Sequence, residues 1–368
     1  MTPRVSVLMS VYNNEEYLEE AIESILNQTF TDFEFIIIDD GSTDGTWAIL
    51  SSYADPRVRL VHNQGNIGLT RSLNKGLTLA QGVYIARMDA DDISLPDRFE
   101  RQIAFLSAYP DVGLLGAGWW NLKSNGEKQQ MVSPPTADSV IRWFLLFGTV
   151  LAHPGVMFRK DLINKVGQYN ENIRFAQDYE LWCRMAQVTR LANLPEPLLL
   201  LRQGDPSRIS EKHLREQWDY NCATSARCIR LLLESDAFTE ERARKLCALI
   251  FLDRTCAEWD LQAAQDLNLV LKHFLARYRT SLTRVDMEQI AGHICMLASY
   301  HDHVNVSVEE WRIFRQLLAT AIRQRLPLPK RYRSWRLFVQ LAIGRRATEY
   351  IRLIRSARRA GFSLRNRQ

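Results

Sequence analysis

The feature that most constrains this chain is the alternation of short apolar runs with segments of helical periodicity over its first 120 residues. The apolar runs, rich in branched side chains, are Val5–Val11, Phe33–Asp39, Val58–His62 and Val83–Met88. Segments with apolar residues three and four positions apart lie between them, at Glu15–Gln28, Thr43–Tyr53 and Thr70–Ala80. This alternation is typical of a sheet wrapped by helices, so we predict an α/β fold with a mostly parallel sheet.

The pattern continues to about residue 205 and then changes character. Further helices are predicted at Pro96–Tyr109, Thr136–Phe147 and Asp178–Gln187, and further strands at Val112–Gly116, Gly155–Phe158 and Leu198–Leu201. From 211 to 323 Gly and Pro almost disappear, and amphipathic helical patterns follow one another. The predicted organisation is therefore an α/β domain over residues 1–210, a helical region over 211–325 and a basic amphipathic helical tail over 326–368.

The tail carries most of the charge asymmetry. The chain has 47 basic and 42 acidic residues, but from Lys330 onwards there are twelve Lys or Arg and one acid, Glu349. Aromatic and aliphatic residues are interleaved with them, as in helices that lie on an anionic membrane surface. A helix docked on its own protein with a solvated basic face fits the pattern equally well. No nucleic-acid recognition motif accompanies the charge, so we expect no nucleic-acid partner.

Targeting patterns and cysteine spacing indicate a cytoplasmic protein. The N-terminus lacks the apolar length of a signal peptide, and no apolar run approaches the ~20 residues that span a bilayer. The six cysteines include no C-x-x-C pair, which favours buried free thiols over a zinc site. We expect a cytoplasmic location, with peripheral contact at the inner face of the cell membrane through residues 330–368.

Carboxylates follow the predicted strands at the positions where such sheets bind ligands, the carboxyl ends. Asp39 and Asp40 end one strand, Asp89-Ala90-Asp91-Asp92 follows another, and Asp178 begins a later helix. In an extended segment Asp89 and Asp91 would point to the same side and could share a divalent cation, which prefers oxygen ligands. Alternatively, Asp89 and Asp92 are only turn and cap residues. The position after an apolar strand, beside a second acidic strand end, favours the metal site.

Two phosphate-binding glycine motifs are missing. The first strand is followed by Tyr12-Asn13-Asn14 rather than G-x-G-x-x-G, which argues against a dinucleotide-dependent oxidoreductase. No G-x-x-x-x-G-K-[ST] occurs either. Phosphates bound by this chain would have to be neutralised by a metal and by side chains.

Several stretches of the first 205 residues, in the same order, resemble the family 2 glycosyltransferases of the GT-A fold. They are Val5-Ser-Val-Leu-Met-Ser-Val-Tyr-Asn13, Ser24-Ile-Leu-Asn-Gln-Thr-Phe30, Ile36-Ile-Ile-Asp-Asp-Gly-Ser-Thr-Asp44, Asn66-Ile-Gly68 and Met88-Asp-Ala-Asp-Asp92. The resemblance implies a GT-A domain followed by an α-helical C-terminal region.

The resemblance also implies roles for individual residues. It assigns Asp178, in Gln177-Asp-Tyr-Glu-Leu-Trp182, as the general base. It assigns Asp91 as the ligand of Mn²⁺ or Mg²⁺, with Asp89 near the ribose and Asp40 on the nucleotide base. It further implies that Ser10 and Tyr12 line the nucleotide pocket and that Arg71 lies near it.

The implied activity is the inverting transfer of a sugar from a nucleotide-diphosphate sugar, with UDP favoured, to an acceptor hydroxyl. The acceptor would be a saccharide or a lipid-linked saccharide in cell-surface polysaccharide or glycolipid biosynthesis. Two departures qualify this. Gln177 stands where the family often has Glu, and the Gln-x-x-Arg-Trp segment of processive members is missing, so a non-processive enzyme is expected.

Two other functions remain open. A sugar-1-phosphate nucleotidyltransferase would need a glycine- and arginine-rich loop after the first strand, whereas residues 12–16 are acidic. A non-catalytic nucleotide-sugar-binding scaffold is kept open by Gln177. Two weaker site candidates are His153, which could face the acceptor or be structural, and Arg202, which could reach the diphosphate or lie on the surface.

Overall fold

The computed structural model describes residues 2–123, 126–203, 213–251 and 260–299, together with residues 324 and 326. The chain divides into two compact units, residues 1–228 and 229–368. The boundaries at 210 and 325 stay predictions, and the basic tail, apart from Leu326, lies outside the described residues. Within the described ranges, no helix combines the length and apolar character that crossing a bilayer requires.

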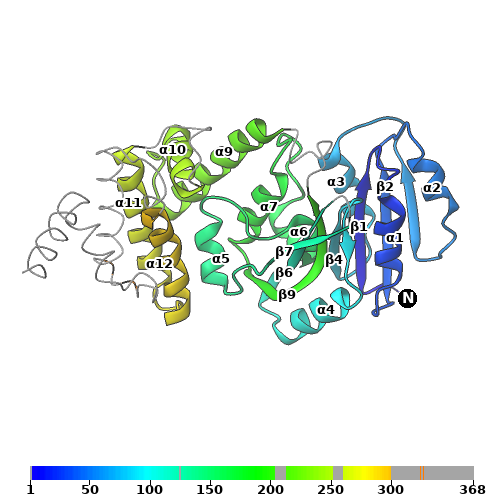
Figure 1. The fold of residues 1–368 in the computed structure, drawn as a ribbon, viewed down its shortest axis with the longest axis horizontal. Helices are drawn as coiled ribbons and strands as arrows, with labels where there is room; N and C mark the ends of the chain where they lie inside the picture. Colours follow the sequence, from blue (N-terminus) through cyan, green and yellow to red (C-terminus); the bar gives the residue numbers. More distant parts are fainter. Residues whose placement is uncertain are drawn as a thin grey trace, which may run out of the picture. The chain divides into compact units, whose positions relative to one another are not determined.

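The first unit is built on one mixed sheet, in which Figure 1 labels β1, β2, β4, β6, β7 and β9. The strand order is β3-β2-β1-β4-β8-β6-β9-β5, and β7 pairs with β6. The strands are β1 (Val5–Val11), β2 (Phe33–Asp39), β3 (Val58–His62), β4 (Tyr84–Met88), β5 (Ile93–Ser94), β6 (Val112–Lys123), β7 (Lys128–Val132), β8 (Met157–Arg159) and β9 (Arg190–Gln203). The first four are parallel, and β8 enters antiparallel between β4 and β6. The predicted α/β fold is confirmed.

Helices cover both faces of the parallel half of the sheet. Val7 and Met9 of β1 point to one face, where they pack with Ile22 of α1 (Leu18–Leu26) and Phe99 of α4 (Arg98–Ala108). On the opposite face α3 (Leu69–Leu79) packs on β1 and β2. Gly76 permits this close approach, because a Cβ at that position would come within 2.0 Å of Leu8 Cδ1. Burial on both faces explains why β1 and β2 read as continuous apolar runs.

Helix α2 (Thr46–Ser52) connects β2 and β3 and contacts α1. The other helices along the chain are α5 (Asp138–Phe144), the short 3₁₀ helix η1 (His153–Gly155), α6 (Asp161–Val166), α7 (Gln177–Met185), α9 (Leu214–Leu233), α10 (Glu240–Phe251), α11 (Leu261–Tyr278) and α12 (Arg284–Ser299), and the described part of the second unit consists of helices. The predicted helical C-terminal region is confirmed in its described part. Four cysteines are buried, as predicted, and form no disulfide among the described residues, namely Cys183, Cys222, Cys228 and Cys247.

The predictions were wrong about strand lengths in the second half of the sheet. The strand expected at Val112–Gly116 continues to Lys123 and forms a hairpin with β7, which was not predicted. The strand expected at Leu198–Leu201 is the end of β9, which runs parallel to β6 along its length. The glycines of β6 mark close packing rather than a strand end, since a Cβ on Gly118 would lie 2.9 Å from the carbonyl oxygens of Pro195 and Val132.

Phe99 gives a test of the core between α4 and the sheet. Its ring is fully buried and packs edge-to-face on Phe33, with 5.7 Å between ring centroids. We expect Phe99→Ala to lower the free energy of unfolding by about 3–5 kcal/mol, because it leaves a cavity that the neighbouring strands cannot fill. Urea unfolding followed by circular dichroism would measure this. Val83→Ala, at a position that is 59% exposed, serves as the control and should change stability by less than about 0.5 kcal/mol.

Candidate active site

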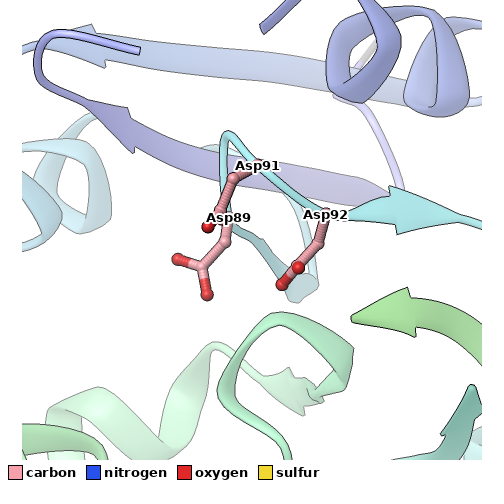
Figure 2. Close-up of side chains that lie close together, drawn as sticks. All are labelled: Asp89, Asp91 and Asp92. Atoms are coloured by element: carbon pink, nitrogen blue, oxygen red, sulfur yellow. The ribbon is translucent and has the colours of Figure 1, made fainter. Parts of the chain in front are cut away.

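The candidate site begins with an acidic turn directly after β4. Asp89, Asp91 and Asp92 each offer a carboxylate oxygen, and these oxygens all lie within 4.8 Å of one another. Figure 2 shows the three side chains reaching to the same side of the turn. The predicted proximity is confirmed, but its geometric reason was wrong, because the segment is a turn rather than an extended strand. A cluster of hard oxygen donors of this size fits Mg²⁺ or Mn²⁺.

Two residues fix the conformation of the acidic turn: one packs into the core, and the other anchors the end of the turn. Ala90 is 5% exposed and belongs to the hydrophobic core, which explains why a small apolar residue separates the aspartates. Asp92 is fully buried, and its Oδ1 accepts a hydrogen bond of 2.9 Å from the backbone N–H of Arg202 in β9. The following strand, β5, pairs antiparallel with β9. The acidic turn is therefore held by the last strand of the sheet.

Two buried arginines supply positive charge beneath the turn. Arg87 of β4 donates from Nη2 to Asp89 Oδ1 at 2.5 Å. Arg98 of α4 donates from Nη2 to the backbone oxygens of Arg87 and Val156, at 2.8 and 3.2 Å. Burial, with the nearby charge of Arg87, lowers the pKa of Arg98 to about 9, so the Arg98 guanidinium remains charged at neutral pH. Sequence reasoning missed Arg87, because its contact with Asp89 depends on the turn that the chain makes after β4.

Asp178 lies at the N-terminus of α7 and is partly buried. Burial raises its pKa from 3.8 to about 6, and the negative charge of Asp89 acts in the same direction. Backbone hydrogen bonds at the helix N-terminus and the charge of Arg87 oppose the shift. A carboxylate with a pKa near 6 is ionised at neutral pH and basic enough to accept a proton, which are the properties of a general base.

His153 lies in the same neighbourhood. Its Nε2 is hydrogen-bonded to the Tyr169 hydroxyl at 2.9 Å, and its ring meets Trp182 edge-on with centroids 6.0 Å apart. Burial lowers its pKa to about 3, and Arg87 acts in the same direction, so the imidazole is neutral. The hydrogen bond shows a structural role for His153. Contact with an acceptor stays a prediction.

Asp39 and Asp40, at the end of β2, are both occupied by the chain's own donors. Asp39 accepts from Ser42 and pairs with His62 Nδ1 at 2.6 Å. Asp40 Oδ1 accepts from Asn63 Nδ2, the backbone N–H of Ile67 and Ser72 Oγ, and its Oδ2 accepts from the backbone N–H of Gly68. Asp40 therefore organises the segment between β3 and α3. Its predicted contact with a nucleotide base remains a prediction.

The other residues assigned to the nucleotide pocket are spread along this edge of the sheet. Ser10 is buried near the end of β1, and Tyr12, just after the strand, is 47% exposed. Arg71 of α3 forms an ion pair of 3.3 Å with Glu171. Arg202 is not a surface residue, because it is 6% exposed, packs 4.2 Å above the Tyr17 ring and pairs with Glu20.

Comparison with known proteins places these features in context. A family model described as Glycosyl transferase family 2 matches residues 6–167. The amylovoran biosynthesis glycosyltransferase AmsE of Erwinia amylovora is 35% identical over 221 residues, which cover 58% of this chain and 80% of AmsE. The O-antigen biosynthesis glycosyltransferase WbnJ of Escherichia coli is 36% identical over 203 residues, which cover 54% of this chain and 79% of WbnJ.

A solved structure has a similar fold. Residues 1–349 of TarS from S. aureus, in complex with UDP or with UDP-GlcNAc, align with a TM-score of 0.50 and 18% identity. The alignment covers 98% of this chain and 93% of that chain. At this identity the likeness concerns the fold alone.

The raised pKa of Asp178 predicts that this residue destabilises the folded protein. An ionised carboxylate disfavours folding when its folded pKa exceeds its unfolded pKa, so the cost is absent at low pH, grows between pH 3.8 and about 6 and is complete above that. A shift of about two units corresponds to at most about 3 kcal/mol, and partial exposure reduces it to roughly 1–3 kcal/mol. Asp178→Asn should therefore be more stable than the wild type at neutral pH.

Thermal unfolding of both proteins in EDTA would measure this difference at about pH 7.5 and about pH 4.5. We expect a higher Tm for Asp178→Asn at the higher pH and a smaller gap at the lower one. If the wild type and Asp178→Asn had the same Tm as each other at both pH values, the raised pKa assigned to Asp178 would be contradicted.

Proposed function

Since the chain belongs to glycosyl transferase family 2, we propose that it transfers a sugar from a nucleotide-diphosphate sugar to an acceptor hydroxyl, with inversion. The observation that carries this proposal is the acidic turn Asp89–Asp92 at the carboxyl end of β4, close enough to Asp178 for the charge of Asp89 to affect its ionisation. A cation-binding cluster beside a carboxylate with a raised pKa provides the two functions that glycosyl transfer needs.

The donor half of the site is assigned to the turn. The carboxylate oxygens fit a hard divalent cation, and we assign Asp91 as its ligand, with Asp89 facing the ribose. Bound there, Mn²⁺ or Mg²⁺ would neutralise the charge that develops on the departing diphosphate. Ser10, Tyr12, Asp40 and Arg71 are our assignments for the nucleotide pocket.

The acceptor half is assigned to Asp178. In this proposal its carboxylate takes the proton of the acceptor hydroxyl while that oxygen attacks the anomeric carbon from the side opposite the diphosphate. A single displacement of this kind inverts the anomeric configuration. The partial burial of Asp178 favours the reaction, because it raises the basicity of the carboxylate without preventing its ionisation at neutral pH.

Relatives guide the choice of donor and acceptor. AmsE and WbnJ are described as biosynthetic for amylovoran and O-antigen, which supports a saccharide or lipid-linked saccharide acceptor in cell-surface polysaccharide or glycolipid synthesis. UDP-sugars are the first donors to test, because the TarS structures of similar fold contain UDP and UDP-GlcNAc. A cytoplasmic position, with residues 330–368 touching an anionic membrane surface, belongs to the same proposal.

Donor binding tests the first half of the proposal. Calorimetric titration of UDP-, GDP- and dTDP-sugars, with and without Mn²⁺, should show one nucleotide class that binds only with the metal. Asp91→Ala should lose this binding, because it removes an assigned ligand. Asp111→Ala is the matched control, since it removes the same charge from an exposed ion pair with Arg190 and should bind as the wild type does. If no donor binds in either condition, the enzymatic proposal fails.

Turnover tests the role of Asp178. We expect Asp178→Asn to lower kcat by about 10²- to 10⁴-fold with little change in donor affinity, because only proton removal is lost. In the wild type the rate should fall about tenfold per pH unit below about pH 6, where Asp178 becomes protonated. Release of the nucleoside diphosphate in the presence of saccharide acceptors would measure both the kcat of Asp178→Asn and the pH dependence of the wild-type rate. A rate in Asp178→Asn near that of the wild type would rule out this base.

A further inference from the structure

Arg87 is placed unusually for a charged residue. It lies in the middle of the sheet on β4, between β1 and β8, and its side chain is 1% exposed. Met88 points into the core, whereas the Arg87 side chain, one position earlier on the opposite face of the strand, reaches the Asp89 carboxylate. The guanidinium donates a hydrogen bond from Nη2 to Asp89 Oδ1, at 2.5 Å.

The hydrogen bonding of the other guanidinium nitrogens distinguishes Arg87 from Arg98. Arg98 is equally buried, but its Nη2 donates to backbone oxygens and its Nε donates to Gln102 Oε1, as in an arginine built into the core. Arg87 Nε and Nη1 are buried and have no hydrogen-bond partner among the described residues. Burying donors in this way is unfavourable, so packing alone does not account for Arg87.

The surroundings of Arg87 come from separate elements of the candidate site. Its charge acts on the ionisation of His153 in η1, of Tyr169 in the segment before α7 and of Asp178 in α7. Asp89 acts on the same three groups. The Arg87–Asp89 pair is therefore the charged centre that the donor-side turn and the acceptor-side residues have in common.

We propose that Arg87 is the positioning residue of the donor site, holding the Asp89 carboxylate in the orientation in which it meets the ribose of a nucleoside diphosphate. A carboxylate at the start of a turn can rotate about two side-chain bonds, and the hydrogen bond from Arg87 Nη2 restricts that freedom. Partners that orient metal ligands typically contribute about tenfold to a hundredfold to affinity or activity, and we expect a similar effect for the carboxylate beside the assigned metal ligand. This inference rests on the proposed function, because it presupposes a bound nucleotide.

A double-mutant cycle on Arg87 and Asp89 tests the proposal. Calorimetry would measure the Kd of UDP in the presence of Mn²⁺ for the wild type, Arg87→Met, Asp89→Asn and the double variant. If Arg87 acts through Asp89, each single change weakens binding about tenfold to a hundredfold, and the double variant is no weaker than Asp89→Asn. Arg87→Lys, which keeps one charged donor, should bind UDP more tightly than Arg87→Met. If Arg87→Met does not fold, the cycle is run with Arg87→Lys.

Arg159→Met is the control for the loss of a partly buried arginine. Arg159 bonds to the backbone oxygens of Val112 and Leu106, away from the acidic turn, so its variant should bind UDP as the wild type does. Wild-type affinity in Arg87→Met, or losses that add in the double variant, would overturn the positioning role while leaving the proposed function intact. A wild-type protein that binds neither UDP nor any other donor would overturn both.

Discussion

The hydrogen bond from the Arg202 backbone N–H to the Asp92 carboxylate joins residues that are 110 positions apart. Next to it, β5 pairs with β9, and Gln28 of the segment after α1 donates to Leu95 at 2.8 Å. These contacts close the loop that follows β4 against both the first helix and the last strand. The positions of Asp89 and Asp91 depend on this closure, because a turn anchored only at β4 would let the carboxylates spread apart by mutual repulsion.

Charge balance explains how three aspartates can lie together in the turn after β4. Asp89, Asp91 and Asp92 contribute three negative charges, and two buried arginines, Arg87 of β4 and Arg98 of α4, offset two of them. A divalent cation would turn this small negative excess into a small positive one, which suits a diphosphate. The buried arginines therefore reduce the repulsion within the turn and still leave an excess of negative charge, which would attract the proposed cation.

The sequence was most informative where one physical cause dominated. Strands β1, β2 and β4 could be predicted because burial on both faces imposes unbroken apolar runs, and the place of the Asp89–Asp92 cluster could be predicted because it ends such a run, although its turn geometry could not. The full length of β9 could not, since Pro195 and Pro197 imitate a loop and are accommodated by register shifts against β6. Arg87 was missed because its partner and its unusual burial arise only when separate elements pack around β4.

Helix α3 connects the two ends of the candidate site. Asp40 binds the N-terminus of α3 through the N–H of Gly68 and the hydroxyl of Ser72. Further along, Asn74 holds the backbone of Tyr169 from both sides, accepting from its N–H at 3.0 Å and donating to its oxygen at 2.9 Å. Tyr169 belongs to the segment that leads into α7 and Asp178. One rigid helix thus sets the separation between the assigned nucleotide pocket and the assigned base, and such preorganisation is what a displacement between two bound substrates requires.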